Sequence, residues 1–461
     1  MRYIPTTPEE RSHMLRTIGV ESLEDLFGDI PEGVRLRSPL GLRRALADPE
    51  LLAYFRQLAE QNAHADRLTC FAGAGAYDHF IPPAVWQLAA RGEFLTAYTP
   101  YQAEITQGEL QAGYEYQTMI CELLGMEVAN ASMYDGASAL AEVAVMSRDL
   151  THRDRVVISG AVHPEYRQVL RTYTAPLGIE AIELPHREGY TSVEEAKKWV
   201  DGRCAALVIQ QPNFFGGIEE AAALAEVAHA AGALFVVATA DPLAFGLLAP
   251  PGEVGADIVA GEGQPLGNPL NFGGPYLGII ATRMQFVRRM PGRLVGATVD
   301  AEGKRGFVLT LQTREQHIRR ERATSNICTN EFLNALAATI YLSLLGPDGV
   351  RQVAELCLQK AHYLKRRIAE LPGYGIAFEG PTFHEFVVRT PLPAATLVRR
   401  LAREGFLAGV PLSRFDPRMR HHLLVCVTEA RTREEMDRFT EALKRVGRPR
   451  QRASALVGRR G

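Results

Sequence analysis

Lysine is scarce in this sequence of 461 residues, although arginine is common. It occurs at only six positions, and no lysine lies between Lys198 and Lys304. Lysine is the side chain that forms a Schiff base with a carbonyl compound. The long segment between these two residues therefore cannot form a covalent link of this kind.

Other familiar signatures are missing as well. The six cysteines are scattered and none forms a Cys-x-x-Cys pair, so buried reduced thiols are expected rather than a metal or redox site. A net charge of −2 gives no indication of binding to nucleic acid or to an acidic membrane surface. No apolar run is long enough to span a membrane and no secretory leader is found, so a cytoplasmic protein is expected. The motifs of serine hydrolases, zinc proteases, P-loop proteins and dinucleotide-binding folds are also absent.

Short apolar segments alternate with amphipathic ones in the middle of the chain. Strands are expected at residues 155–159, 181–184, 205–210 and 234–239, and helices at residues 163–173, 192–201 and 219–231. This alternation predicts an α/β protein with a mostly parallel sheet covered on both faces. In such sheets a ligand lies beyond the carboxyl ends of the strands, where His163 and Asp241 are expected.

The whole chain is expected to divide into four parts: an N-terminal helical arm (1–65), a large α/β domain (66–330), a small C-terminal α+β domain (331–446) and a basic tail (447–461). The arm begins with a capping box at Thr7 and is too short to bury a core, so it is expected to pack on another domain or another chain. Residues 283–305 are basic and are expected to be irregular. The small domain is expected to open with two long helices, 331–345 and 350–370.

The segment Gly255–Arg283 has an unusual arrangement. A short apolar strand (256–260) leads into a loop broken by glycine and proline, and a second strand (276–282) returns. This arrangement is similar to the one in which the pyridoxal-phosphate (PLP) fold of the aminotransferase type keeps its Schiff-base lysine. Here Gln264 and Pro265 stand at the expected place, and neither can form an imine. Lys304 lies about forty residues too late in the chain to be an attractive substitute.

Three other groups of a PLP site do have candidates. An aspartate must hold the pyridine nitrogen protonated, and Asp241 follows a strand. An aromatic ring must stack on the cofactor, and His163 follows another strand. The helix start at Asp135–Ser138 could bind a phosphate through free backbone N–H groups. Each feature also has an ordinary structural explanation, because Asp-Pro and His-Pro commonly begin turns or helices.

A polar, aromatic loop forms a second candidate site. Tyr98, Tyr101, Gln102 and Glu104 place two phenols, an amide and a carboxylate around Pro100. Such a loop, held by proline, is typical of a binding-site wall. The alternative is a surface loop that only precedes a helix.

Several longer motifs resemble one family. They are Tyr98–Gly108, Tyr116–Ile120, Asn130–Ser132, Gly261–Gly267 and Arg320–Cys328. They resemble the amino-terminal half of glycine decarboxylase, the P-protein of the glycine cleavage system, and the likeness extends from about residue 5 to about residue 445. The length matches subunit 1, the alpha chain, of the two-chain form of this enzyme.

The resemblance implies a PLP-dependent transferase fold of aminotransferase type I without a covalently bound cofactor. The PLP is then carried by a separate beta subunit. The implied reaction is the decarboxylation of glycine and transfer of the aminomethyl group to the lipoyl arm of the H-protein. In that case His163, Asp241 and Gln264 are vestigial cofactor positions. Tyr98, Tyr101, Gln102 and Glu104 then contribute to a pocket shared with the beta subunit. No metal, nucleic acid or membrane is implied.

Two alternatives remain at this point. The chain could be a non-catalytic scaffold of the PLP fold that only stabilises its partner. It could also be an independent PLP enzyme that uses Lys304.

Overall fold

The computed structural model describes residues 5–36, 38–95 and 97–447. The predicted basic tail therefore lies almost entirely outside the described residues. The chain divides into two units, residues 1–63 and residues 64–461. The predicted boundary between a large and a small domain within the second unit stays a prediction.

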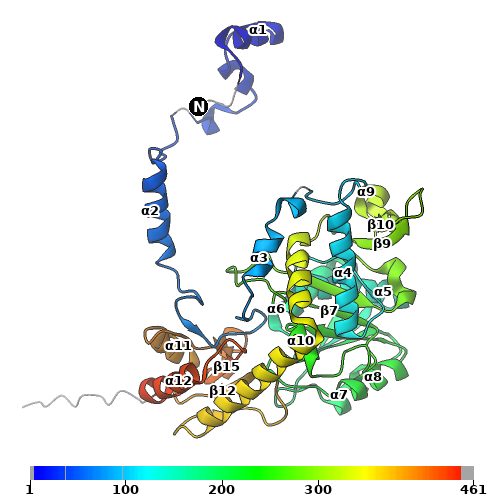
Figure 1. Ribbon diagram of the computed structural model, residues 1–461, viewed down its shortest axis with the longest axis vertical. Coiled ribbons are helices and arrows are strands. Elements are labelled where there is room, and N and C mark those ends of the chain that lie inside the picture. Colours follow the sequence, from blue (N-terminus) through cyan, green and yellow to red (C-terminus); the bar gives the residue numbers. More distant parts are fainter. Residues whose placement is uncertain (1–4, 37, 96, 448–461) are drawn as a thin grey trace, which may run out of the picture. The chain divides into compact units, whose positions relative to one another are not determined.

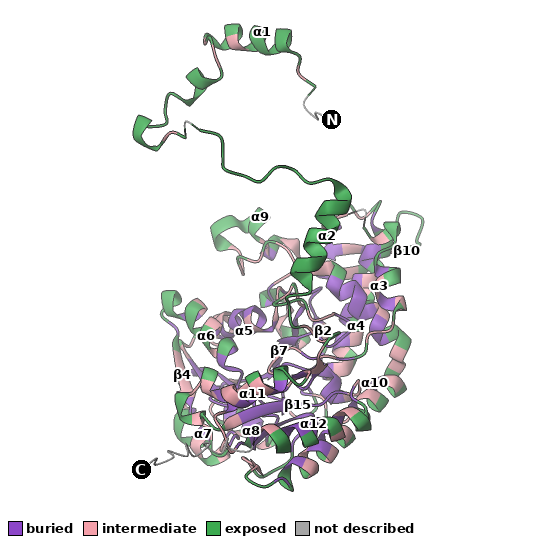
Figure 2. Ribbon diagram, turned by 90° about the vertical axis from the view of Figure 1, so that its left-hand side faces the viewer, coloured by how far each residue is buried: buried purple, intermediate pink, exposed green. Residues whose placement is uncertain are grey.

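The first unit contains two α-helices, α1 (Pro8–Ile18) and α2 (Asp48–Ala59), and two short 3-10 turns, η1 (Glu24–Phe27) and η2 (Glu32–Val34). The capping box at Thr7 is confirmed, because Thr7 and Glu10 bind each other's backbone N–H groups. No described residue of this unit is buried, and Figure 2 shows α2 as exposed and α1 as exposed except for a short intermediate part. This unit therefore has no hydrophobic core of its own.

The second unit is built on a seven-stranded sheet in the order β2-β8-β7-β6-β5-β3-β4. Its strands are β2 (Val128–Ala129), β3 (Arg155–Ser159), β4 (Glu180–Leu184), β5 (Cys204–Gln210), β6 (Leu234–Thr239), β7 (Ile258–Glu262) and β8 (Gly278–Thr282). The pairs from β4 to β7 are parallel, and β8 is antiparallel to both of its neighbours. The predicted mostly parallel sheet is confirmed.

Helices cover both faces of this sheet. They are α3 (Ala84–Ala89), α4 (Gln107–Leu124), α5 (Gly136–Thr151), α6 (Pro164–Thr174), α7 (Val193–Trp199), α8 (Ala221–Ala230) and α10 (Phe332–Ala369). Alternate residues of each strand enter two different cores, as Val157 and Val156 of β3 do. One core lies against α5 and α6, and the other lies against α4, α7, α8 and α10. Figure 1 shows α4 and the first part of α10 running beside each other.

A smaller antiparallel sheet follows α10. It has the order β11-β12-β15-β14, with strands β11 (Gly375–Ile376), β12 (Glu385–Arg389), β14 (Val410–Pro411) and β15 (His422–Cys426). Helices α11 (Ala394–Ala402) and α12 (Arg433–Val446) pack on it around Phe386 and Phe439. A short parallel pair, β1 (Thr69–Cys70) with β13 (Phe406–Leu407), ties the start of this unit to the same core.

The prediction of an irregular segment at residues 283–305 is wrong in part. Strands β9 (Leu294–Val299) and β10 (Arg305–Thr310) form an antiparallel hairpin, and helix α9 (Gln316–Arg319) follows it. The outer half of β9 is exposed, so its side chains show no alternation between buried apolar and exposed polar residues. Among the described residues, no helix is both long and apolar enough to cross a membrane.

Candidate functional site

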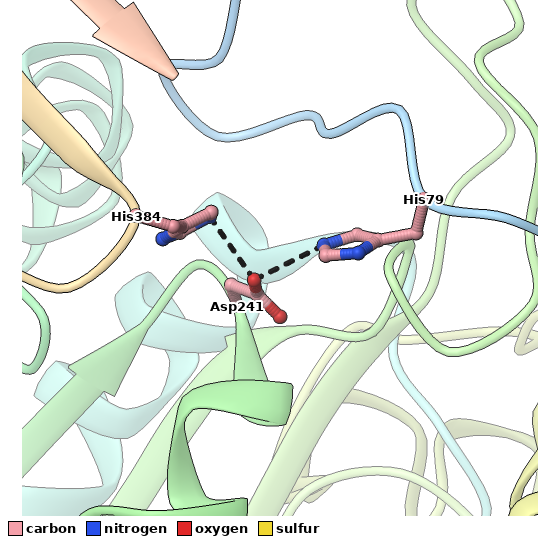
Figure 3. A group of neighbouring side chains, drawn as sticks. All are labelled: His79, Asp241 and His384. Carbon is pink, nitrogen blue, oxygen red and sulfur yellow. Dashed lines mark hydrogen bonds and ion pairs between the residues drawn. The ribbon is translucent and has the colours of Figure 1, made fainter. Parts of the chain in front are cut away.

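The buried site is centred on Asp241, which lies two residues beyond the end of strand β6. Its carboxylate oxygen Oδ2 lies 3.2 Å from Nε2 of His79 and 3.1 Å from Nε2 of His384. Figure 3 shows the two imidazole rings approaching this oxygen from opposite sides. His79 comes from the loop between β1 and α3, and His384 directly precedes β12. Two segments far apart in the sequence therefore meet at the end of one strand.

His79 also contacts a second carboxylate. Its Nδ1 lies 2.6 Å from Oε2 of Glu429, and Oε2 also accepts from the thiol of Cys357. Burial alone would lower the pKa of His79, but the charges of Asp241 and Glu429 outweigh this effect and raise it well above its usual value. Likewise, burial would raise the pKa of Asp241, but the two histidines lower it. His79 therefore lies between two carboxylates that favour its imidazolium form.

Gln264 stands in the loop after β7, and its side chain is fully engaged. Its Oε1 accepts from the backbone N–H of Tyr77 at 2.8 Å. Its Nε2 donates to the carbonyl oxygens of Tyr77 at 3.0 Å and Asn268 at 2.7 Å. Because the residue is only 1% exposed, these bonds fix the amide in the protein interior.

The helix start at Asp135–Ser138 is occupied by carboxylates of the chain itself. Asp135 accepts from the backbone N–H of Ser138 at 2.7 Å, and Glu262 accepts from that of Gly136 at 3.0 Å. The other oxygen of Glu262 accepts from the backbone N–H groups of Gln264 and Leu277, both at 2.9 Å. Burial raises the pKa of Glu262 to about 8, although these donors act in the opposite direction.

His163 lies at the end of β3, where it was expected, but it packs within the protein. Its Nε2 lies 2.9 Å from the carbonyl oxygen of Ala74, and its ring contacts those of Tyr166 and Phe214. Burial lowers its pKa. Ala74 in turn donates its backbone N–H to Glu385, so His163 is connected to the loop that also carries His79.

The side chains of this site do not fit PLP. The cofactor needs a free carboxylate for its ring nitrogen, free N–H groups for its phosphate and a lysine for its aldehyde. In this chain Asp241 is paired with two histidines, the first turn of α5 binds Asp135 and Glu262, and the loop after β7 contains no lysine.

The loop Tyr98–Glu104 forms a separate, exposed feature. Tyr98 is 86% exposed and Tyr101 51% exposed, and Gln102 and Glu104 are also exposed. Tyr101 alone is anchored: its hydroxyl accepts from Nη2 of Arg293 at 2.8 Å, and the guanidinium group lies 5.3 Å from the centre of its ring. The loop thus presents three exposed polar side chains around one anchored phenol.

Arg293 connects this loop to the segment that contains Cys328. The arginine is 4% exposed and donates to the carbonyl oxygen of Cys328 at 2.6 Å and to Oδ1 of Asn330 at 3.1 Å. A small surface pocket lies beside it, lined by both Arg293 and Arg314. Two of the five motifs of the family resemblance, Tyr98–Gly108 and Arg320–Cys328, therefore meet at one arginine.

Sequence reasoning missed His79, His384 and Arg293. His79 and His384 lie 305 positions apart in the sequence (384 − 79), and neither belongs to a recognisable motif. The only local signal for His79 is its position in the glycine- and aromatic-rich segment after Cys70. Arg293 was part of a basic segment that gave no reason to choose one arginine over another.

The comparisons with known proteins agree with this architecture. The family model described as "Glycine cleavage system P-protein" matches residues 1–443. A relative from Desulfitobacterium hafniense, named "Probable glycine dehydrogenase (decarboxylating) subunit 1", is 54% identical over 97% of this chain and 100% of its own length. A relative of the same name from Moorella thermoacetica is 53% identical with the same coverage.

Solved structures give the same result. A crystal structure of glycine decarboxylase (P-protein) in inhibitor-bound form is 48% identical, with a TM-score of 0.87, and covers 97% of this chain and 100% of its own. A sphingosine-1-phosphate lyase from Burkholderia pseudomallei is 16% identical with a TM-score of 0.62, over 89% of this chain and 92% of its own. This distant likeness concerns the fold alone, and it confirms the predicted PLP-dependent transferase fold. The chain belongs to the glycine cleavage system P-protein family.

Proposed function

We propose that this chain is subunit 1 of a two-chain glycine dehydrogenase (decarboxylating). In this proposal a separate beta subunit carries the PLP, and the complex decarboxylates glycine and transfers the aminomethyl group to the lipoylated H-protein. The complex works in the cytoplasm. The relatives that match over their full length, and whose names give both the activity and the words "subunit 1", support this assignment.

The main support for the proposal is the buried, hydrogen-bonded side chain of Gln264. The residue stands where the fold would place a covalent lysine, and its amide is buried and bound to Tyr77 and Asn268. A chain with this arrangement cannot form the imine on which PLP chemistry depends. If the enzyme acts on glycine, a second chain must therefore supply the cofactor.

The part played by this chain in the reaction is assigned to the loop Tyr98–Glu104. Its support is that the side chains of Tyr98, Gln102 and Glu104 are exposed while the buried Arg293 holds Tyr101 in place. A largely exposed phenol beside a fixed one suits a surface that is covered by another chain. We infer that this loop forms one wall of a glycine pocket whose other wall belongs to the beta subunit.

The N-terminal unit supports the need for a partner. It exposes many large apolar side chains, among them Ile18, Phe27, Leu42 and Phe55. Apolar side chains in this number are unusual on the surface of a monomeric protein and mark interaction sites. The arm is therefore proposed to bind the beta subunit.

The proposal is tested by glycine–bicarbonate exchange with lipoylated H-protein. The assay is run with this chain alone, with a beta subunit alone and with both, and a visible spectrum is recorded for each. Exchange and an imine absorption band are expected in the mixture, and neither is expected in this chain alone. An imine band in the isolated chain would instead support an independent PLP enzyme.

Loop variants separate a shared active site from a scaffold. In the reconstituted complex, Tyr101→Phe and Glu104→Gln are expected to reduce kcat/KM for glycine by about 10- to 100-fold, because a hydrogen bond to a charged group contributes about 1.5–3 kcal/mol. Lys304→Gln is the matched control, since Lys304 is exposed and pairs only with the neighbouring Glu302. If both loop variants assemble normally and keep full activity, the chain is a scaffold.

A further inference from the structure

We propose that this chain has replaced the cofactor of its fold by polar side chains of its own. The imidazolium of His79 stands for the pyridinium ion, and the carboxyl group of Glu262 takes the place of the phosphate. This inference concerns only interactions within the chain. It therefore holds or fails independently of the proposed glycine pocket shared with a beta subunit.

The cationic end of the replacement is built around Asp241. In PLP enzymes of this fold an aspartate binds the protonated ring nitrogen. Here the Asp241 carboxylate, 1% exposed, binds Nε2 of His79 at 3.2 Å, and His384 adds a second ring nitrogen at 3.1 Å. An imidazolium resembles a pyridinium in being a flat, cationic N–H donor. A buried aspartate without such a partner would be strongly destabilising, so the fold requires a replacement when the cofactor is absent.

The end that takes the place of the phosphate lies at the start of helix α5. A helix N-terminus with free N–H groups favours an anion, and in this fold that anion is the phosphate. Glu262 is 3% exposed and comes from the end of strand β7, and its Oε2 accepts the N–H of Gly136, the first residue of the helix. A Cβ atom on Gly136 would lie 3.0 Å from Cβ of Glu262, which shows how closely the two segments pack. The carboxyl group therefore occupies the place that a phosphate would need.

The loop that follows Cys70 lies against residues of both ends, and the ring of Tyr77 has its centre 4.8 Å from that of His384. Tyr77 binds Gln264 through its backbone and donates its hydroxyl to Glu385 at 2.8 Å. A Cβ atom on Gly73 would lie 2.3 Å from Oε1 of Glu385 and 2.8 Å from Cβ of Cys426. This loop therefore packs against the small sheet so tightly that only glycine fits at position 73. The ring of a cofactor could enter only if this loop moved.

The cationic end is tested by removing the imidazole ring of His79 and then supplying free imidazole in solution. The full-length His79→Gly variant is expected to have a lower melting temperature, because Asp241 and Glu429 lose their shared cation. Millimolar imidazole is expected to bind the variant in a 1:1 ratio and to recover most of the lost melting temperature. If imidazole raises the melting temperature of the variant no more than that of the wild type, the replacement is refuted.

His229→Gly is the matched control for this experiment. His229 also pairs with an aspartate, Asp257, at 2.9 Å, but 46% of its side chain is exposed. Its removal leaves open solvent instead of a cavity, so imidazole is expected to have no effect beyond that on the wild type. An equal response of the two variants would show that the rescue is not specific to Asp241.

Two further measurements use the wild-type chain, so they do not depend on whether a variant folds. Equilibrium dialysis with pyridoxine 5′-phosphate, which has the ring and the phosphate but no aldehyde, is expected to show no stoichiometric binding. Elemental analysis is expected to find no stoichiometric metal, although the ligating atoms of His79, Asp241 and His384 lie within 4.8 Å of one another. Binding of one pyridoxine 5′-phosphate per chain, or one metal ion per chain at these residues, would overturn the proposal.

Discussion

In the buried site, the hydrogen bonds of Glu262 are expected to contribute to the stability of the fold. Its two carboxyl oxygens accept three backbone N–H groups, from Gly136, Gln264 and Leu277. In Glu262→Gln the amide oxygen can still accept from two of them, but the amide nitrogen cannot accept from Gly136. An unsatisfied buried donor costs about 1–3 kcal/mol, so urea denaturation is expected to show a loss of this size in the free energy of unfolding.

The control for this variant is Glu127→Gln. Glu127 also accepts a backbone N–H, from Met284 at 2.7 Å, but it is exposed. Water can replace the lost acceptor there, so the expected change is within about 0.5 kcal/mol. Equal losses in the two variants would mean that burial of Glu262 does not determine its contribution.

Glu262 also predicts a pH dependence of stability. Burial raises its pKa from 4.5 to about 8 in the folded protein. Between these two values the folded state holds a proton that the unfolded state has lost, so stability falls as pH rises. The contribution is complete below pH 4.5 and is lost as pH rises through about 8. The free energy of unfolding of the wild type, minus that of Glu262→Gln, should therefore decrease between about pH 5 and about pH 9. A difference that is constant or increases would contradict the raised pKa.

The residues of the site were predictable only where strand topology places them. Asp241 and His163 follow apolar strands, and the ends of parallel strands meet at one edge of a sheet. His79 and His384 come from a loop and from the start of an antiparallel strand in another sheet. Their approach to Asp241 depends on the packing of three segments that no local pattern connects. Such contacts depend on the tertiary fold, and no repeating pattern of residues in the sequence predicts them.

At the scale of elements, helix α10 depends on the unusual backbone conformation of one glycine. Two helices were predicted at residues 331–345 and 350–370, and the structure has a single element, Phe332–Ala369, broken at Gly346. Gly346 has φ 59° and ψ −179°, a conformation that is essentially confined to glycine. Gly346→Ala is therefore expected to lower the free energy of unfolding by about 1–3 kcal/mol, although the added methyl group would meet no other atom within 4 Å.

Gly108→Ala provides the comparison. Gly108 lies in helix α4 with an ordinary helical backbone, and its Cβ would also meet nothing within 4 Å. Alanine favours a helix more than glycine does, so this variant should be neutral or more stable by up to about 1 kcal/mol. Thermal unfolding of both variants checks the pair. If Gly346→Ala were as stable as Gly108→Ala, the backbone of Gly346 would not impose the break.

The elements themselves were predictable to the extent that their apolar pattern is strong. Strands β3 (Arg155–Ser159) and β6 (Leu234–Thr239) have the predicted boundaries, because each is a continuous apolar run between polar turns. Strands β9 and β10 were missed because one end of their hairpin is exposed and carries charged and small residues. The two strands are defined by their backbone pairing with each other, which the pattern of side chains does not reveal.

At the scale of the whole molecule, the two units differ in what stabilises them. The unit of residues 64–461 has several buried apolar clusters, the largest of them on the two faces of the main sheet. The described residues of the first unit include none that is buried. A segment without buried apolar surface cannot offset the entropy cost of its own ordering. Its order must therefore come from a surface outside the segment.

This difference predicts how the arm responds to protease. In the isolated chain, limited proteolysis should cleave first within residues 5–63, because local opening there requires little free energy. In a complex with the beta subunit, the cleavage rate in this segment should fall by at least about tenfold, since bound apolar side chains such as Phe27 and Phe55 would have to be exposed again. Mass spectrometry of the fragments gives both rates, and cleavage within exposed residues 300–304 serves as the internal reference. If the arm is cut equally fast in both states while the reference site is unchanged, the exposed apolar residues of the arm do not form the contact with the partner, and the role proposed for this unit is wrong.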